Sequence, residues 1–267
     1  MKLGVIGAGG RMGRMLVQTI QETGGAELAA ACEHAGSPYL GQDAGLLANV
    51  GELGVAIGDS AEAVFEACDA VMEFSVPMAT IAHAPLAAKH GAAHVIGTTG
   101  LTAEQEAILA KAAEKTCIMY APNMSVVVNL MFALVEQVSG LLGTDYDIEV
   151  MEMHHKHKID APSGTAVGLG QAAARGRKVA LPDVAQWSRE GQTGARREGD
   201  IGFAALRGGD VVGEHTVIFA GAGERLEISH RCTNRQLFAG GAVRAALWTE
   251  GQKPGLYSMM DVLGIKL

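Results

Sequence analysis

Five basic or titratable side chains stand together in the middle of the sequence, at residues 154–158 (His-His-Lys-His-Lys). They follow residues 147–153, in which apolar and polar side chains alternate as in a half-buried strand. The chain as a whole is acidic, with 21 Lys and Arg against 29 Asp and Glu. A cluster of cations at a strand end in an acidic protein indicates a local binding site for an anion.

A helix start follows this cluster within a few residues, where the sequence Pro-Ser-Gly-Thr precedes a helix-like run. Ser163 is a natural N-cap, and the N–H groups of Gly164 and Thr165 are then able to hold an anion. Lysine and histidine beside such a helix start suit a small dianion, such as a dicarboxylate. A positioned Lys158 or His154 could supply a proton as a general acid.

Two other interpretations of this cluster stay open. Three histidines within four residues could bind a metal ion. However, no cysteine or nearby carboxylate completes an evident metal site, and lysines between the ligands disfavour a bound cation, so we predict no metal. The cluster could also be a solvated, basic strand end. Glu152, just before the cluster, is interpreted as an orienting partner rather than as a base.

A second chemically suggestive pattern lies near the start of the sequence. Residues 7–13 (Gly-Ala-Gly-Gly-Arg-Met-Gly) follow a short apolar run and precede a helix-like run. Glycines at such a turn let the backbone approach a pyrophosphate, and the helix start offers N–H groups and a positive dipole. Glu33 follows a second strand candidate, at the distance typical of the acid that binds an adenosine ribose. The context favours a dinucleotide site over an ordinary glycine turn.

The same acid bears on the choice of cofactor. A carboxylate at Glu33 should repel the 2′-phosphate of NADPH. Arg11 and Arg14 are near in sequence and could counter that repulsion, whereas His34 is mostly neutral at pH 7 and could help only partly. We predict that NADH is used at least as well as NADPH.

The elements that would position these residues change in type along the chain. In the first half, short strand-like runs alternate with helix-like runs, which is typical of a parallel sheet with right-handed crossovers. The predicted strands are 3–6, 27–32, 70–74, 94–96 and 116–121, and the predicted helices are 14–22, 61–67, 78–90 and one that Thr102 caps with Gln105.

The second half has a different character from about Ser125 onward. After a predicted helix at 127–142, strands follow one another with glycine-rich joints, which favours an antiparallel or mixed sheet. These strands are predicted at 147–153, 201–207, 214–220 and 225–231, before a last helix at 237–248. The fold class is therefore α/β, with a Rossmann-type dinucleotide-binding domain and a second α+β domain that holds an open mixed sheet.

Composition narrows the possible partners and compartments. The net charge of −8 argues against a general nucleic-acid-binding protein. Four widely spaced cysteines form no C-x-x-C pair and are interpreted as reduced core residues of a cytoplasmic protein. No signal peptide is evident, and no apolar stretch is long enough for a membrane helix. We therefore expect a small-molecule substrate, with no nucleic acid and no membrane as partner.

Residues 152–166 resemble the signature of the dihydrodipicolinate reductase family, also called 4-hydroxy-tetrahydrodipicolinate reductases, which serve bacterial diaminopimelate and lysine synthesis. The resemblance extends over essentially the whole chain. Besides 7–13 and Glu33, it includes the segments 74–77 (Phe-Ser-Val-Pro), 97–100 (Gly-Thr-Thr-Gly), 121–125 (Ala-Pro-Asn-Met-Ser), 188–191 (Ser-Arg-Glu-Gly), 213–216 (Gly-Glu-His-Thr) and Arg235 to Arg244.

The resemblance implies a role for each matching position. His154 and Lys158 would handle the proton, and His155, Gly164 and Thr165 would bind the substrate carboxylates. The dinucleotide, NADH or NADPH, would be held by Gly7, Ala8, Gly9, Gly10, Arg11, Met12, Glu33, Gly97, Thr98, Thr99, Ala121, Pro122, Asn123 and Met124. The reaction implied is hydride transfer to 4-hydroxy-tetrahydrodipicolinate, a cyclic dicarboxylate, to give tetrahydrodipicolinate.

The resemblance also implies the domain organisation. Residues 1–124 with 235–267 would form the dinucleotide-binding domain, because the last helix returns to it in the family. Residues 125–234 would form the substrate-binding and oligomerisation domain of a homotetramer. Three positions depart from the family pattern: His34 is often Arg, Glu73 is commonly Asp and Gly240 is commonly Asn. His34, in place of an arginine, argues against a strong preference for NADPH.

Two rival functions stay open at this point. A related Rossmann reductase, such as an aspartate- or homoserine-type dehydrogenase, would have no reason for the His/Lys cluster. A nucleotide-sensing or scaffold protein on the same fold would not need an anion site either. Binding of a dicarboxylate only after the cofactor is the observation that would favour the reductase.

Overall fold

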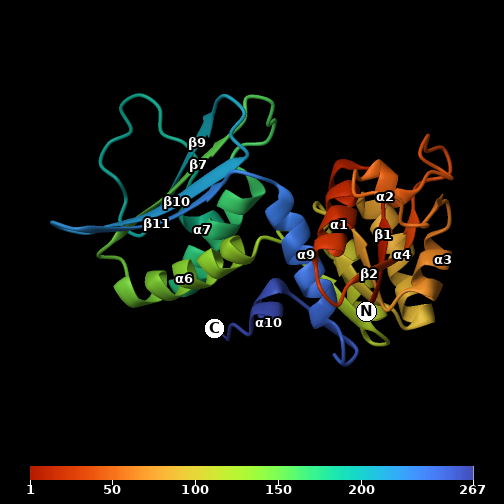
Figure 1. Cartoon of the computed structure of the whole chain (residues 1–267). Helices are drawn as coiled ribbons and strands as arrows, with labels where there is room; N and C mark the ends of the chain where they lie inside the picture. Colours follow the sequence, from red (N-terminus) through yellow and green to blue (C-terminus); the bar gives the residue numbers. More distant parts are fainter. Residues whose placement is uncertain (267) are drawn as a thin grey trace. The chain divides into compact units, whose positions relative to one another are not determined.

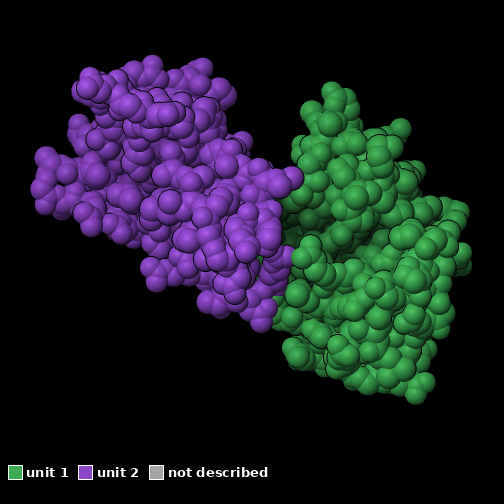
Figure 2. All heavy atoms as spheres, turned by 90° about the horizontal axis from the view of Figure 1, so that it is seen from above, with its two compact units in different colours: residues 1–126, 236–266 green, residues 127–235, 267 purple. Residues whose placement is uncertain are grey.

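The computed structural model describes residues 1–266, which form two compact units. Unit 1 comprises Met1–Val126 and Gln236–Lys266, and unit 2 comprises Val127–Arg235 (Figure 2). Each unit has its own sheet and its own hydrophobic core. Leu267, the last residue of the expected dinucleotide-binding domain, lies outside the described residues. Within residues 1–266, no helix is long and apolar enough to span a membrane.

Unit 1 is built on a parallel sheet of seven strands in the order β12-β6-β5-β4-β1-β2-β3. The strands are β1 (Lys2–Ile6), β2 (Glu27–Cys32), β3 (Ile57–Gly58), β4 (Ala70–Glu73), β5 (Ala93–Ile96), β6 (Cys117–Tyr120) and β12 (Gly255–Tyr257). The order reverses between β1 and β4. At such a switch point, ligands bind outside the carboxyl ends of the strands. This topology confirms the predicted Rossmann-type sheet.

Helices cover both faces of this sheet (Figure 1). The core on one face includes α1 (Arg11–Glu22) and α9 (Gln236–Trp248), and the core on the other includes α3 (Ala61–Ala67), α4 (Pro77–His90) and α5 (Ala103–Ala113). The strands supply both cores because successive side chains point to opposite faces. Met72, for example, packs with the first set of helices and its neighbour Val71 with the second.

The helix ends agree with the sequence in most places. Thr102 and Gln105 form the predicted capping box at the start of α5. Helix α1 begins at Arg11 rather than at Arg14, directly after the glycines. Sequence reasoning missed the short elements α2 (Ala44–Leu47), α8 (Leu181–Val184), β8 (Ala185–Gln186) and α10 (Met259–Leu263), together with β3 and β12.

Unit 2 has a mixed sheet of five strands in the order β11-β10-β7-β9-β8. Its long strands are β7 (Asp147–His154), β9 (Ile201–Arg207), β10 (Gly213–Ala220) and β11 (Arg225–Cys232). Helices α6 (Val126–Leu142) and α7 (Gly164–Gly176) pack on one face of this sheet (Figure 1). The prediction that these strands follow one another without helices is wrong for the first pair. Helix α7, whose start the N-cap Ser163 predicted, lies between them with α8 and β8, and β7 and β9 run parallel.

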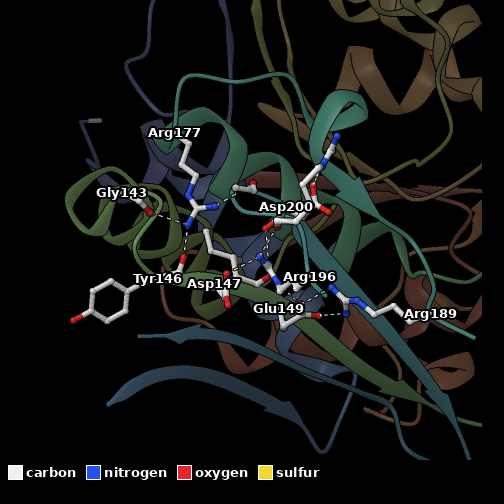
Figure 3. A network of polar contacts seen from close by, with 11 residues as sticks. Gly143, Tyr146, Asp147, Glu149, Arg177, Arg189, Arg196 and Asp200 are labelled. Atoms are coloured by element: carbon white, nitrogen blue, oxygen red, sulfur yellow. Dashed lines mark hydrogen bonds and ion pairs between the residues drawn. The ribbon is translucent and has the colours of Figure 1, made fainter. Parts of the chain in front are cut away.

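The long segment between β8 and β9 is held to β7 by arginines (Figure 3). Arg189 donates to both oxygens of Glu149, at 2.9 and 2.8 Å. Arg196 donates to Asp147 at 2.6 Å and to the backbone oxygen of Asp200 at 2.6 Å. Because only 19% of the Arg196 side chain is exposed, this ion pair is partly shielded from water. The polar loop predicted at 191–197 is thus anchored at the end of the segment that leads into β9.

The return of α9 to unit 1 rests on a close approach that a side chain would block. A Cβ at Gly241 would lie 1.7 Å from the backbone oxygen of Met124, whereas a Cβ at the neighbouring Gly240 would meet nothing within 4 Å. Gly241→Ala should therefore destabilise the protein by about 1–3 kcal/mol. Gly240→Ala should be neutral or stabilise it by up to about 1 kcal/mol, because alanine is the better helix former. Urea unfolding of both variants measures the difference, and equal free energies of unfolding would contradict this packing.

Candidate active site

A buried carboxylate organises the end of β7. The side chain of Glu152 is 0% exposed. Its Oε1 accepts from the backbone N–H of Ser163 at 3.0 Å and from Arg207 Nη2 at 2.9 Å. Its Oε2 accepts from Arg207 Nη1 at 2.8 Å and lies 2.6 Å from His154 Nδ1. One carboxylate therefore joins a strand end, a neighbouring strand and the start of α7.

These contacts set the charge of the two partners. Burial by itself would raise the pKa of Glu152, but hydrogen bonds from Arg207, His154 and the Ser163 N–H outweigh it and lower the pKa below its usual range. Desolvation lowers the pKa of His154, against the opposing effect of Glu152. At pH 7, His154 is therefore a neutral imidazole beside a carboxylate. Its Nδ1 carries the proton, because the carboxylate can only accept, and Nε2 is left as an acceptor.

Lys158 presents an ammonium close to this histidine in the chain. Its Nζ lies 2.8 Å from Asp160 Oδ1, and 20% of its side chain is exposed. The hydrogen bond from Lys158 lowers the pKa of Asp160. The backbone N–H of Lys158 also donates to the oxygen of His155 at 3.1 Å, which turns the chain directly after β7. The expected proton-handling pair thus lies at the end of β7 and just after the turn that follows it.

Helix α7 begins next to these residues with a side-chain cap. Ser163 Oγ accepts from the backbone N–H of Ala166 at 3.1 Å, as its role of N-cap predicts. Gly164 is exposed and Thr165 is half-buried, and the first turn of this fully described helix carries no acidic side chain. The N–H groups of this turn and the helix dipole favour an anion there.

Sequence reasoning assigned no role to two arginines of this region. Arg207 reaches Glu152 because the register of β7 and β9 pairs it with His154. Arg235 Nη2 lies 3.4 Å from His155 Nε2, which adds a guanidinium beside a residue expected to bind carboxylate. The sequence near either arginine does not predict these contacts, because Arg207 and Arg235 are far along the chain from residues 152–155 and reach them only through the tertiary structure.

The glycine turn of unit 1 connects β1 to α1. Its Gly10 is the N-cap and has no side-chain hydrogen bond, and the first turn of α1 holds no acidic residue among those described. Gly7 has a φ of +77°, which favours glycine. A Cβ at Gly13 would lie 2.1 Å from the oxygen of Gly7, so only glycine lets the helix start this close to the turn. An uncapped helix start with no acidic residue fits a pyrophosphate.

The predicted ribose acid lies against this turn. Glu33 Oε1 accepts from the Gly9 N–H at 2.9 Å. His34 is largely exposed, with its Nε2 4.0 Å from Glu33 Oε2. Arg11 is exposed, whereas the guanidinium of Arg14 lies 4.9 Å from the centre of the Tyr39 ring, and its Nε donates to the Gly9 oxygen.

The other expected cofactor residues follow neighbouring strands at the same edge of the sheet. Gly97–Thr99 follow β5 and residues 121–124 follow β6, and the Ala121 N–H donates to the oxygen of Ile96 at 3.1 Å. Several of these residues are buried: Ala8, Thr98, Ala121 and Met124. Thr99 and Pro122 are exposed, and Met12 and Asn123 are half-buried.

A second buried acid fixes this edge. Glu73, at the end of β4, lies 2.8 Å from His94 Nε2 and 3.0 Å from His83 Nδ1 and accepts from the Ser75 hydroxyl. Burial would raise the pKa of Glu73, but the hydrogen bonds from both histidines lower it strongly. The Ser75 N–H donates to Thr98 Oγ1, which couples the segments after β4 and β5. Within residues 1–266, no group of three His, Cys, Asp or Glu side chains is arranged to hold a metal ion.

Comparisons with known proteins agree along the whole chain. The family model described as "Dihydrodipicolinate reductase, N-terminus" matches residues 1–124, and "Dihydrodipicolinate reductase, C-terminus" matches residues 127–263. The 4-hydroxy-tetrahydrodipicolinate reductases of Methylocella silvestris and Afipia carboxidovorans are 55% and 54% identical, over 99% of this chain and 97% of their own.

A solved structure supports the same assignment. The dipicolinate-bound dihydrodipicolinate reductase from Paenisporosarcina sp. TG-14 is 25% identical, covers 98% of both chains and has a TM-score of 0.74. The two family models together cover residues of both units. The His/Lys segment, the glycine turn and all strands of both sheets lie within the matched residues. On these grounds the chain belongs to the dihydrodipicolinate reductase family.

Proposed function

We propose that this protein reduces 4-hydroxy-tetrahydrodipicolinate to tetrahydrodipicolinate with NADH or NADPH, in diaminopimelate and lysine synthesis. The observation that supports the proposal is the Glu152-centred cluster, in which one buried carboxylate contacts His154 and the start of α7, close in the chain to the Lys158 ammonium. The names of the relatives support the activity, and the dipicolinate on the Paenisporosarcina enzyme supports a cyclic dicarboxylate as ligand.

The cofactor would be held by unit 1. The residues proposed for it are Gly7, Ala8, Gly9, Gly10, Arg11, Met12, Glu33, Gly97, Thr98, Thr99, Ala121, Pro122, Asn123 and Met124. When bound, the nicotinamide supplies the hydride. The backbone N–H groups at the start of α1 would face the pyrophosphate, and Glu33 would exchange its hydrogen bond from Gly9 for hydroxyls of the ribose.

The substrate would be held by unit 2. His155 and the N–H groups of Gly164 and Thr165 would bind its carboxylates, and Arg235 adds a cation that complements the dianion. Overall, the hydroxyl group and one ring proton leave as water, and one hydride from the nicotinamide and one proton then add to the unsaturated ring. We assign the proton to the Lys158 ammonium, because His154 is neutral and its Nδ1–H is held by Glu152. His154 Nε2 can then accept a proton or orient water beside Lys158.

The assembly and compartment are part of the same proposal. Unit 2 would form a homotetramer through the sheet face that α6 and α7 leave uncovered, where Met151 and Leu206 are exposed. Light scattering should then give four times the chain mass of 27.7 kDa, and a monomer would contradict the assembly.

Cys32, Cys68, Cys117 and Cys232 are all buried and unpaired, which supports a cytoplasmic enzyme. Recovery of the protein outside the cytoplasm on cell fractionation would contradict a cytoplasmic location.

A coupled assay tests the activity. Pyruvate, aspartate semialdehyde and the upstream synthase generate the unstable substrate in the cuvette, and oxidation of NADH and NADPH is followed separately. We expect oxidation that depends on the synthase, with NADH used at least as well as NADPH. Failure to oxidise either cofactor, by protein that binds NADH, would overturn the proposed function.

The cofactor preference should depend on the charge of Glu33. Glu33→Gln removes the carboxylate that opposes a 2′-phosphate and weakens the bond to the ribose hydroxyls. We expect the ratio of kcat/KM for NADH over NADPH to fall by about tenfold, which corresponds to about 1.4 kcal/mol. Glu27→Gln, at the exposed opposite end of β2, is the matched control and should leave the ratio unchanged. An unchanged ratio in Glu33→Gln would show that this residue does not contact the ribose.

The proton donor can be tested with a neighbouring lysine as control. Lys158→Ala should lower kcat by about 100-fold or more, the usual contribution of a general acid, while the Kd of NADH stays the same. Lys156→Ala removes an exposed lysine two residues away and should change kcat less than about twofold. If Lys158→Ala retained full turnover, the role assigned to Lys158 would be wrong.

A further inference from the structure

His215 is a buried histidine that the proposed reaction leaves without a role. It lies on β10, on the face of the sheet that α7 covers, and 5% of the residue is exposed. The register of β7 and β10 places it directly opposite Glu152, and the register of β10 and β11 places it opposite His230. A row of ionisable side chains therefore crosses three neighbouring strands beneath the start of α7.

Ser163 is held from two sides by this row. Its backbone N–H donates to Glu152 Oε1 at 3.0 Å, and its Oγ lies 3.0 Å from His215 Nε2. The same Oγ accepts from the Ala166 N–H and caps the helix. The rings of His215 and His154 meet edge to face, with centroids 5.1 Å apart and an interplanar angle of 74°. His215 thus contacts both the N-cap of the substrate-binding helix and the proton-handling histidine.

The surroundings of His215 keep it neutral and select one tautomer. Burial and the neighbouring His154 lower its pKa to about 4; Glu152 opposes this shift, and His230 and Lys158 add to it. Its Nδ1 has no hydrogen-bond partner among residues 1–266. A buried N–H without a partner is rarer and more costly than a buried acceptor without one. The proton therefore lies on Nε2, which donates to Ser163 Oγ.

We propose that His215 is a positioning residue for the substrate site: through its Nε2–H it fixes the Ser163 hydroxyl and, with it, the first turn of α7 relative to His154. The N–H groups of Gly164 and Thr165 can bind carboxylates well only if this turn is held in one orientation. A ring packed against His154 also limits where that imidazole can move. This inference rests on the proposed function for the identity of the ligand, but the contacts that carry it are independent of turnover.

The test compares two substitutions that differ in reach. Glutamine places its Nε2–H near the position of the imidazole Nε2–H, whereas asparagine is too short to reach Ser163. We expect His215→Asn to bind pyridine-2,6-dicarboxylate about five- to tenfold more weakly in calorimetric titration of the NADH-loaded protein, the size expected for one lost hydrogen bond. KM for the substrate should rise by a similar factor, while kcat changes less. His215→Gln should stay within about twofold of the unsubstituted protein in both measurements.

His230 provides the matched control. It is also buried, has its Nδ1 without a partner among the described residues and lies beside His215 on β11, but no hydrogen bond joins it to Ser163. His230→Asn should leave dicarboxylate affinity and KM unchanged. A merely structural role for His215 would lower the active fraction, and so the apparent kcat, with no change in KM and no rescue by glutamine.

Three outcomes would overturn the inference: wild-type dicarboxylate affinity in His215→Asn, equal weakening in His230→Asn, or no difference between the Gln and Asn variants. Loss of NADH binding would reveal that His215→Asn does not fold. In that case the double variant His215→Gln/Ser163→Ala is compared with His215→Gln alone. The Gln variant should then lose its affinity once the serine hydroxyl is gone, and unchanged affinity would contradict the proposal. If the unsubstituted protein does not oxidise NADH in the coupled assay, the proposed function fails, whatever the variants show.

Discussion

The buried carboxylate of Glu152 is the constraint on which the rest of unit 2 depends. A charge with no exposure to water must be paired and hydrogen-bonded, and removing one partner from such a pair typically costs about 3–5 kcal/mol. The partners here come from β7, β9 and the start of α7. Satisfying one acid therefore fixes the register of two parallel strands and the position of a helix N-terminus at the same time.

The chemistry of the site follows from this constraint. Because Glu152 can only accept, it holds the proton of His154 on Nδ1 and stabilises the Arg207 guanidinium next to it. Desolvation, with a smaller effect of the nearby cations Lys158 and Arg207, keeps His154 neutral, which is why we propose the Lys158 ammonium as the acidic group of this site. The same arrangement gathers positive charge and helix N–H groups where a dicarboxylate would bind, in a chain whose net charge is −8.

Unit 1 also joins segments that are distant in sequence, through its parallel sheet and a buried acid. Its parallel sheet brings the segments after β1, β4, β5 and β6 to one edge, although they are far apart in sequence. A second buried acid, Glu73, joins β4 to His94 of β5 and His83 of α4, and Ser75 couples the segments after β4 and β5 through its N–H to Thr98.

Much of the fold was predictable from the sequence because local signals agree with the tertiary structure. Alternating residues predicted β7, and Thr102 with Gln105 predicted the start of α5. The Gly7–Gly13 turn and Ser163 carry their own backbone chemistry, so their positions at helix starts were predicted too. Register has no such local signal. The parallel pairing of β7 with β9, and the placement of Arg207, His215 and Arg235 beside the His/Lys turn, depend on packing between distant segments.

The most direct test of the account is the tautomer of His154, because Glu152 is held to keep its proton on Nδ1. Long-range ¹H–¹⁵N NMR spectra distinguish the two neutral tautomers of histidine from the imidazolium form. At pH 7 and without ligands, we predict a neutral His154 with its proton on Nδ1, and a pKa below the ordinary histidine value. Glu152→Gln should remove the preference for that tautomer. A His154 that is an imidazolium at pH 7, or that carries its proton on Nε2, would contradict the account.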